Sequence, residues 1–159
     1  MTDSKEVLTQ ARGFYAGVAA EFLGIYKQGP RFVAVTGVPR SNTAGAAEMF
    51  AEALREAGQD VQRVSAGDTG ADRFRMETIA PFRSRDSVLV VDGPGLLDAD
   101  FRGLWNFSLW VEHDTEGSVD PSVGTTEATY SLGDPREVAS VLFDDTDPER
   151  PRRLWADSC

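Results

Sequence analysis

Apolar residues recur along this chain at two spacings, one typical of helices and one of buried strands. Between residues 6 and 26 they are separated by four, four and three positions, which predicts an amphipathic helix: Phe14, Val18, Phe22 and Ile25. Gly29-Pro30 then ends this helix. The nearly continuous apolar run Phe32–Thr36 has the length of a strand that is buried on both faces.

A turn and a second helix are expected after this strand. Residues 37–43 (GVPRSNT) form the turn, and residues 44–57 place apolar side chains on one stripe: Ala47, Phe50, Ala51 and Leu54. Gly58 is in position to cap the end of that helix.

The rest of the chain repeats the alternation of strands and helices. Further strands are expected at 61–65, 87–91, 108–111 and 141–143, helical segments at 74–82 and 98–105, and a turn or helix at 136–140. This order predicts one α/β domain over residues 1–159, with a three-layer, doubly wound parallel sheet of about five strands. Residues 113–130 are polar and irregular, and an acidic, proline-rich tail is expected from Asp144 onward.

Composition narrows the function classes. The chain is 41% hydrophobic, enough for a core, and no apolar run approaches the roughly 18 residues of a membrane span. A formal charge of −10 disfavours nucleic acid and anionic lipid as partners, and it means that nucleotide binding needs a local cluster of cations. The single cysteine, Cys159, permits no internal disulfide. No secretory signal pattern follows Met1, so we expect a cytoplasmic protein.

The first strand, turn and helix have the frame of a phosphate-binding P-loop. In an α/β sheet, ligands bind at the carboxyl ends of the strands, where Gly37, Gly67, Asp92 and Asp144 fall. The P-loop pattern G-x-x-x-x-G-K-[ST] brings backbone N–H groups, a lysine and a magnesium-binding hydroxyl to the phosphates. Counted from Gly37, its last three positions hold N-T-A, residues 42–44.

The turn keeps several groups that suit an anion. A helix N-terminus exposes N–H groups, so the candidate contacts to a nucleotide or phosphate are Gly37, Arg40, Ser41, Asn42 and Thr43. A simple strand-to-helix turn also explains Gly37, and helix capping explains Ser41, Asn42 and Thr43 without any ligand.

Four passages resemble the uridine kinase branch of the P-loop kinases. The first two are residues 32–54, and residues 63–65 followed by Asp68. The third is residues 88–110 (VLVVDGPGLLDADFRGLWNFSLW), with an acid-Gly pair after a strand and then an LWD-like helix. The fourth is residues 139–154 (ASVLFDDTDPERPRRL), similar to a tail of pattern DN-T/S-DPE-P. The resemblance spans nearly the whole chain from Phe14 to Leu154. It implies a P-loop NTPase-type fold and an ATP-dependent nucleoside kinase.

The positions that perform phosphoryl transfer in that family are replaced, so the loop is a degenerate Walker A motif. Thr43 stands where the resemblance implies the lysine, Ala44 where it implies the magnesium hydroxyl, and Gly67 where it implies the acid that takes the nucleoside proton. Asp68 follows one residue late and is the remaining candidate catalytic acid. No lysine or arginine occurs between residues 102 and 136, where the family's lid brings arginines over the phosphates.

Two further acids and one histidine are candidates for function. Asp92 resembles the acid that orders magnesium-bound water, although Asp92-Gly93 also suits a hairpin turn. Asp145 lies in the passage that resembles the family's adenine-side tail, and an acidic surface turn explains it as well. His113, the sole histidine, is expected at a strand end without a catalytic role, because no partner motif surrounds it.

These observations leave three hypotheses. In the first, a uridine-kinase-like pseudoenzyme has lost phosphoryl transfer and acts as a binding or regulatory module for a nucleotide, nucleoside or phosphate anion. In the second, an active small-molecule kinase of nucleoside type uses Arg40, Asp68 and Asp92 as phosphate clamp, base and magnesium ligand. ATP and Mg²⁺ are expected as cofactors only in that case. In the third, residues 113–130 or an exposed sheet surface dock a protein partner, such as a second copy of the chain.

Overall fold

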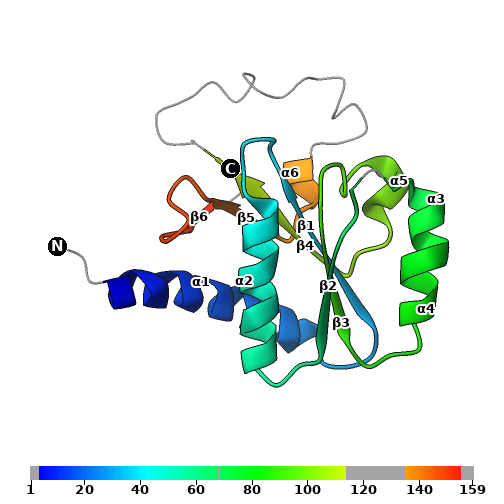
Figure 1. Cartoon of the computed structure of the whole chain (residues 1–159), viewed down its shortest axis with the longest axis horizontal. Coiled ribbons are helices and arrows are strands. Elements are labelled where there is room, and N and C mark those ends of the chain that lie inside the picture. The colour runs from blue at the N-terminus through cyan, green and yellow to red at the C-terminus, as the bar shows by residue number, and fades with distance from the viewer. Residues whose placement is uncertain (1–3, 68, 114–134, 155–159) are drawn as a thin grey trace.

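A six-stranded sheet runs through the middle of the molecule, with helices on both of its faces (Figure 1). The computed structural model describes residues 4–67, 69–113 and 135–154. The strand order is β2-β3-β1-β4-β5-β6, which confirms the doubly wound α/β class expected from the alternation of strands and helices. Among the described residues, no helix combines the length and the apolar character that a bilayer crossing requires.

Five of the strands are parallel. They are β1 (Arg31–Gly37), β2 (Val61–Ser65), β3 (Val88–Asp92), β4 (Phe107–Glu112) and β5 (Val141–Asp144). The chain passes from β1 toward β2 on one side, whereas β4 lies on the other side of β1. The loops after β1, β3 and β4 therefore meet at one edge, the point of a doubly wound sheet where ligands bind.

The sixth strand corrects the prediction for the tail. Residues from Asp144 onward were expected to be an acidic, proline-rich tail, and no strand was predicted there, but β6 (Arg152–Leu154) pairs antiparallel with β5. Leu142 lies opposite Leu154, and Asp144 lies opposite Arg152. Three residues are too few for the alternation of a strand to be recognised in the sequence. This strand forms because the edge of β5 offers unpaired backbone groups to it.

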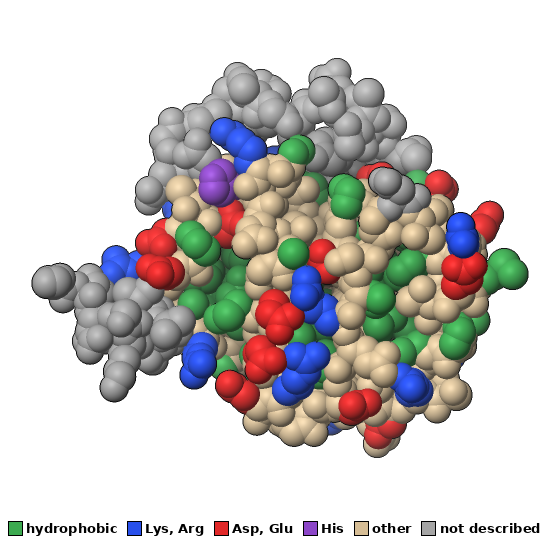
Figure 2. All heavy atoms as spheres, viewed as in Figure 1, with side chains coloured by type: hydrophobic (Ala, Val, Ile, Leu, Met, Phe, Trp, Pro, Cys, Tyr) green, Lys and Arg blue, Asp and Glu red, His purple; other side chains and the backbone are tan. Residues whose placement is uncertain are grey.

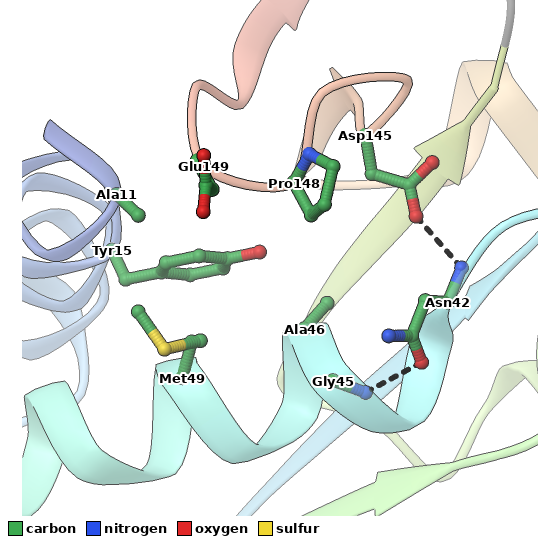
Figure 3. Close-up of a pocket in the computed structure, with 9 residues that line it drawn as sticks. All are labelled: Ala11, Tyr15, Asn42, Gly45, Ala46, Met49, Asp145, Pro148 and Glu149. Atoms are coloured by element: carbon green, nitrogen blue, oxygen red, sulfur yellow. Dashed lines mark hydrogen bonds between the residues drawn. The ribbon is translucent and has the colours of Figure 1, made fainter. Parts of the chain in front are cut away.

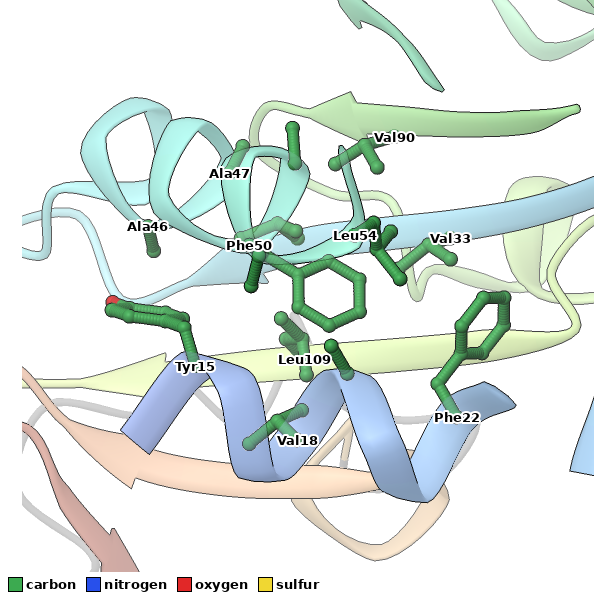
Figure 4. Packing of buried hydrophobic residues seen from close by; sticks show 14 of the residues in the cluster. Tyr15, Val18, Phe22, Val33, Ala46, Ala47, Phe50, Leu54, Val90 and Leu109 are labelled. Carbon is green, nitrogen blue, oxygen red and sulfur yellow. The ribbon is translucent and has the colours of Figure 1, made fainter. Parts of the chain in front are cut away.

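One face of the sheet is covered by α1 (Ser4–Ile25) and α2 (Thr43–Glu56), as Figure 4 shows. Phe22 and Phe50 are fully buried between these helices and the strands, and Val18 is 3% exposed, as the helical spacing predicted. Ile25 was expected on the same stripe but is 66% exposed, because α1 ends at this residue. Gly58 has φ +89° after the last turn of α2, which confirms its predicted capping position.

The opposite face is covered by a helical segment from residue 71 to 82 and by a shorter helix. The segment consists of α3 (Ala71–Phe74), a π-helical stretch (Arg75–Ile79) and α4 (Ala80–Phe82); the other helices of the described part are α5 (Ala99–Arg102) and α6 (Pro135–Val138). Phe74, Ile79 and Phe82 pack there against Phe32 and Leu89 of the strands. Successive residues of a strand thus point alternately into two cores, one on each face of the sheet.

Candidate functional site

The loop between β1 and α2 lies against the end of β4. The Val38 backbone N–H donates to the Val111 carbonyl oxygen at 3.0 Å, so the pairing of the two strands continues past Gly37. A Cβ atom on Gly37 would collide with that same carbonyl oxygen. The close approach of the two strands is therefore sufficient to account for a glycine at this position.

The polar side chains of the loop bond to the loop itself. Ser41 Oγ donates to the Val38 carbonyl oxygen at 2.6 Å, and Asn42 Oδ1 accepts from the Gly45 backbone N–H at 2.9 Å as the N-cap of α2. Thr43 is the first residue of that helix. Arg40 is exposed and forms no ion pair with any residue that the structure describes. Its guanidinium is the one cation that the loop sequence itself offers to an anion.

The Asp145 carboxylate lies at the amino end of α2 (Figure 3). Its Oδ2 accepts a hydrogen bond from the Asn42 backbone N–H at 2.7 Å, and its Oδ1 lies 2.8 Å from Nδ1 of His113. The residue is 6% exposed. In a P-loop, the backbone N–H groups of this turn bind phosphate. Here one of them binds a carboxylate from the same chain.

A pocket of about 240 Å³ opens beside this contact, between α1, the first turns of α2 and the turn after β5 (Figure 3). Its walls are mostly apolar, with Asn42 and Asp145 at one end and Glu149 near Tyr15 at the other; the remaining lining residues are Ala11, Gly45, Ala46, Met49 and Pro148. Of the residues that the structure describes, no lysine or arginine lines it. Burial raises the pKa of the Tyr15 hydroxyl, and the negative charge of Asp145 raises it further. The walls of the pocket are thus mostly apolar, and the electrostatic potential inside it is negative.

Asp92, the candidate metal ligand, is held by residues of the neighbouring strand. Its Oδ1 accepts from Ser65 Oγ at 2.9 Å and from Arg63 Nη2 at 3.3 Å. Arg63 Nη1 also donates to Oε2 of Glu48 on α2 at 2.9 Å. Figure 2 shows acidic and basic side chains side by side over this helix. The buried Asp92 carboxylate therefore already has a cation as its partner.

These residues do not fit a magnesium ion. Ala44, at the position implied for the magnesium hydroxyl, carries no oxygen on its side chain. Within the described ranges, no three side chains of His, Cys, Asp and Glu come together as a metal site. Arg63 supplies to Asp92 the positive charge that a metal would supply.

The predicted site residues fall into two groups. Asn42 and Asp145 are in contact at the start of α2, while Asp92 is bound to Arg63 at the ends of β2 and β3. Gly67 has φ +57° in the following loop. Asp68, the candidate acid, lies outside the described residues, as do residues 114–130 of the segment proposed to dock a partner.

Three residues of the site were missed by the sequence reasoning. His113 directly follows β4 as expected, but it has a partner in Asp145. Arg63 was treated only as part of a strand. A charged residue inside a strand expected to end near a candidate acid is a signal that could have indicated the ion pair. Tyr15 lies next to the apolar stripe of α1 and gave no signal of its own.

Comparison with known proteins identifies the fold. No family model matches the sequence, and no curated protein sequence matches it. The structure is similar to that of a possible uridine kinase from Bacillus stearothermophilus, with a TM-score of 0.64 and 14% identity, over 84% of this chain and 98% of that one. A protein assigned as a fructose transport system kinase from Silicibacter sp. TM1040 matches with a TM-score of 0.48 and 16% identity, over 62% of this chain and 74% of that one. The first of these matches shows a uridine kinase-like P-loop kinase fold, as the sequence resemblance implied.

Proposed function

We propose that this protein uses a uridine kinase-like P-loop fold to bind a small molecule without transferring phosphate, as a binding or regulatory module. The observation that carries the proposal is the 2.7 Å hydrogen bond from the Asn42 backbone N–H to Asp145. That N–H group belongs to the turn that binds phosphate in a P-loop. An internal carboxylate already satisfies it here.

Charge supports the same conclusion. Two like unit charges about 4 Å apart repel by roughly 4 kcal/mol at an effective dielectric constant near 20. A phosphate oxygen near Asn42 would therefore meet repulsion from Asp145 in place of the attraction of the P-loop lysine, whose position holds Thr43. Phosphoryl transfer depends almost wholly on positioning and on stabilisation of developing negative charge. A turn with this balance of charge favours ligands other than a triphosphate.

The environment of Asp92 adds a second, independent argument. Asp92 is 5% exposed, and its Oδ1 accepts hydrogen bonds from Ser65 and Arg63. For this carboxylate to take a metal, the Arg63 guanidinium has to move away, which would also break its contact with Glu48. A buried carboxylate that has lost its positively charged partner is costly. The pairing of Asp92 with Arg63 therefore opposes metal binding.

The experiment is a transfer assay with radiolabelled ATP, Mg²⁺ and a panel that includes uridine and cytidine. We expect no transfer above the rate in buffer. Turnover on the order of 1–100 s⁻¹, the usual range for kinases, would disprove the proposal. The Arg63→Ala protein is assayed beside the natural chain, so that an activity suppressed only by this pairing is recognised as such.

A second candidate is an active small-molecule kinase with a non-standard loop. It is favoured by one observation: Arg40 is exposed in the loop and has no ion-pair partner among the described residues. In this candidate Arg40 clamps phosphate, and Asp68 and Asp92 act as base and metal ligand. It predicts that Arg40→Ala and Asp92→Asn each abolish a measurable turnover. Turnover that is unchanged in both variants would eliminate it.

A further inference from the structure

We propose that the pocket beside Asp145 binds an organic cation, a protonated amine carried on a small, flat apolar body. The inference rests on the proposed function, because it requires Asp145 to remain at the start of α2 where a phosphate would otherwise lie. It goes further by naming the chemical class of the ligand. The argument uses the walls of the pocket, its charges and its size.

The walls suit a flat apolar group. Figure 3 shows the Tyr15 ring along one side, with Met49 below it and Pro148 facing it across the opening. Tyr15 is only 4% exposed, so its ring is held in place by the core. Aromatic and thioether groups pack well against ligand rings, and a rigid wall orders a ligand at little entropic cost.

The pocket has a carboxylate on each of two sides. Asp145 is buried beside Asn42, and Glu149 is exposed and lies above the Tyr15 ring, as Figure 3 shows. The partners of Asp145, Asn42 N–H and His113 Nδ1, occupy one position on each of its two oxygens. A carboxylate oxygen has two lone pairs, so each retains acceptor capacity toward an ammonium group.

The field of Asp145 extends into the cavity as far as Tyr15. Burial is the larger cause of the raised pKa of the Tyr15 hydroxyl, and the charge of Asp145 is the second. An ammonium group above the Tyr15 ring would lie between Asp145 and Glu149, and both carboxylates and the face of the ring would attract it. Because no lysine or arginine among the described residues lines the pocket, no side chain of either kind described here competes for this position.

Other ligand classes fit less well. A phosphate-bearing ligand would bring negative charge toward Asp145 and Glu149. A neutral ring would fill the apolar part but would desolvate these carboxylates without compensation. The volume of about 240 Å³ is below the roughly 300–1,000 Å³ of pockets for drug-sized ligands, which favours one ring system with a short amine arm.

Calorimetric titration with tryptamine and with tryptophol tests the proposal, because the two probes differ only in an ammonium and a hydroxyl group. We expect tryptamine to bind at least about tenfold more tightly, a difference of about 1.4 kcal/mol. Asp145→Asn keeps an oxygen for the Asn42 N–H, and Glu149→Gln removes the charge at the opening. Each is expected to reduce the preference for tryptamine severalfold. Glu56→Gln removes an equal charge from an exposed position outside this pocket and is expected to leave the preference intact.

Equal binding of both probes, binding of neither, or tighter binding of adenosine or ATP with Mg²⁺ would overturn the inference. If Asp145→Asn does not fold, the exposed Glu149→Gln variant decides the question, since an unchanged preference in it contradicts the assigned charge. Failure here is distinct from failure of the proposed function. ATP turnover in the transfer assay counts against the latter, whereas a lost amine preference without turnover counts against the ligand class alone.

Discussion

Nη2 of Arg63 lies 3.3 Å from Oδ1 of Asp92, so the acid at the end of β3 has a cation from the neighbouring strand as its partner. The register places Ser65 directly opposite Asp92, and Arg63 lies two residues before Ser65 on the same face of β2. The same guanidinium contacts Glu48, so it joins α2 to the sheet as well. A position that the family resemblance assigns to metal chemistry is thus part of an internal ion-pair network.

Replacing Arg63 by methionine is expected to destabilise the protein by about 2–3 kcal/mol, because it leaves the buried Asp92 carboxylate without its cation. Chemical denaturation measures the change in the free energy of unfolding. Arg73→Met is the matched control, since its pair with Glu77 is exposed on both sides and is worth less than about 1 kcal/mol. Equal losses in the two variants would show that the Asp92 pairing has no special role.

Replacing Asp145 by asparagine is expected to raise the affinity for inorganic phosphate by about tenfold or more. The substitution removes the negative charge beside the Asn42 N–H and retains an acceptor for it. Isothermal titration with phosphate measures the effect. Glu56→Gln removes one negative charge, as Asp145→Asn does, but at an exposed position of α2, and it serves as control. A gain of the same size in both variants would assign the effect to net charge and not to Asp145.

Replacing Gly37 by alanine is expected to cost at least about 1–3 kcal/mol, because its Cβ would collide with the backbone carbonyl of Val111, which cannot rotate away. Thermal unfolding followed by circular dichroism measures the loss. In Gly17→Ala, the new Cβ meets no atom within 4 Å on the exposed side of α1. That control is expected to gain about 0.5–1 kcal/mol through helix propensity. A neutral Gly37→Ala would mean that β1 and β4 separate easily at this end.

The pair of Glu21 and Arg153 links α1 to β6 and predicts a dependence of stability on pH. Hydrogen bonds from Arg153, at 2.6 and 3.0 Å, lower the pKa of Glu21 below its ordinary value of 4.5. Partial burial acts in the opposite direction and raises this pKa, while the positive charge of Arg153 lowers it further. A carboxylate with a lowered pKa stabilises the folded state at pH values above its ordinary pKa. This contribution is lost as the pH falls through the lowered pKa.

Glu21→Gln is therefore expected to lower the free energy of unfolding by less than about 1 kcal/mol near neutral pH, because the pair is half exposed and screened by solvent. The difference from the natural protein is expected to disappear at pH values below the lowered pKa of Glu21, where this residue is protonated in both the folded and the unfolded state. Urea denaturation over this range measures it. A difference that persists at the acid end would point to lost packing rather than to charge.

Local patterns in the sequence are sufficient to predict much of this fold. Helical spacing and apolar runs report which face of an element is buried, and Val18, Phe22 and Phe50 are buried as their spacing predicts. The alternation of elements then restricts the sheet to parallel strands with helices on both faces. That Thr43 and Ala44 stand where the family resemblance implies a lysine and a hydroxyl is also visible without any structure.

The chemistry of the site depends on partners that are far apart along the chain. Asn42 and Asp145 are separated by 103 positions, and Arg63 and Asp92 by 29. No periodicity links such pairs, because they meet only where the ends of β1, β3 and β5 converge at one edge of the sheet. The sequence by itself determined the elements and the residue types in the loop, since both are local properties. Tertiary structure alone decided that Asp145 accepts the Asn42 N–H and that Arg63 pairs with Asp92, since a carboxylate acquires its partner through packing in space.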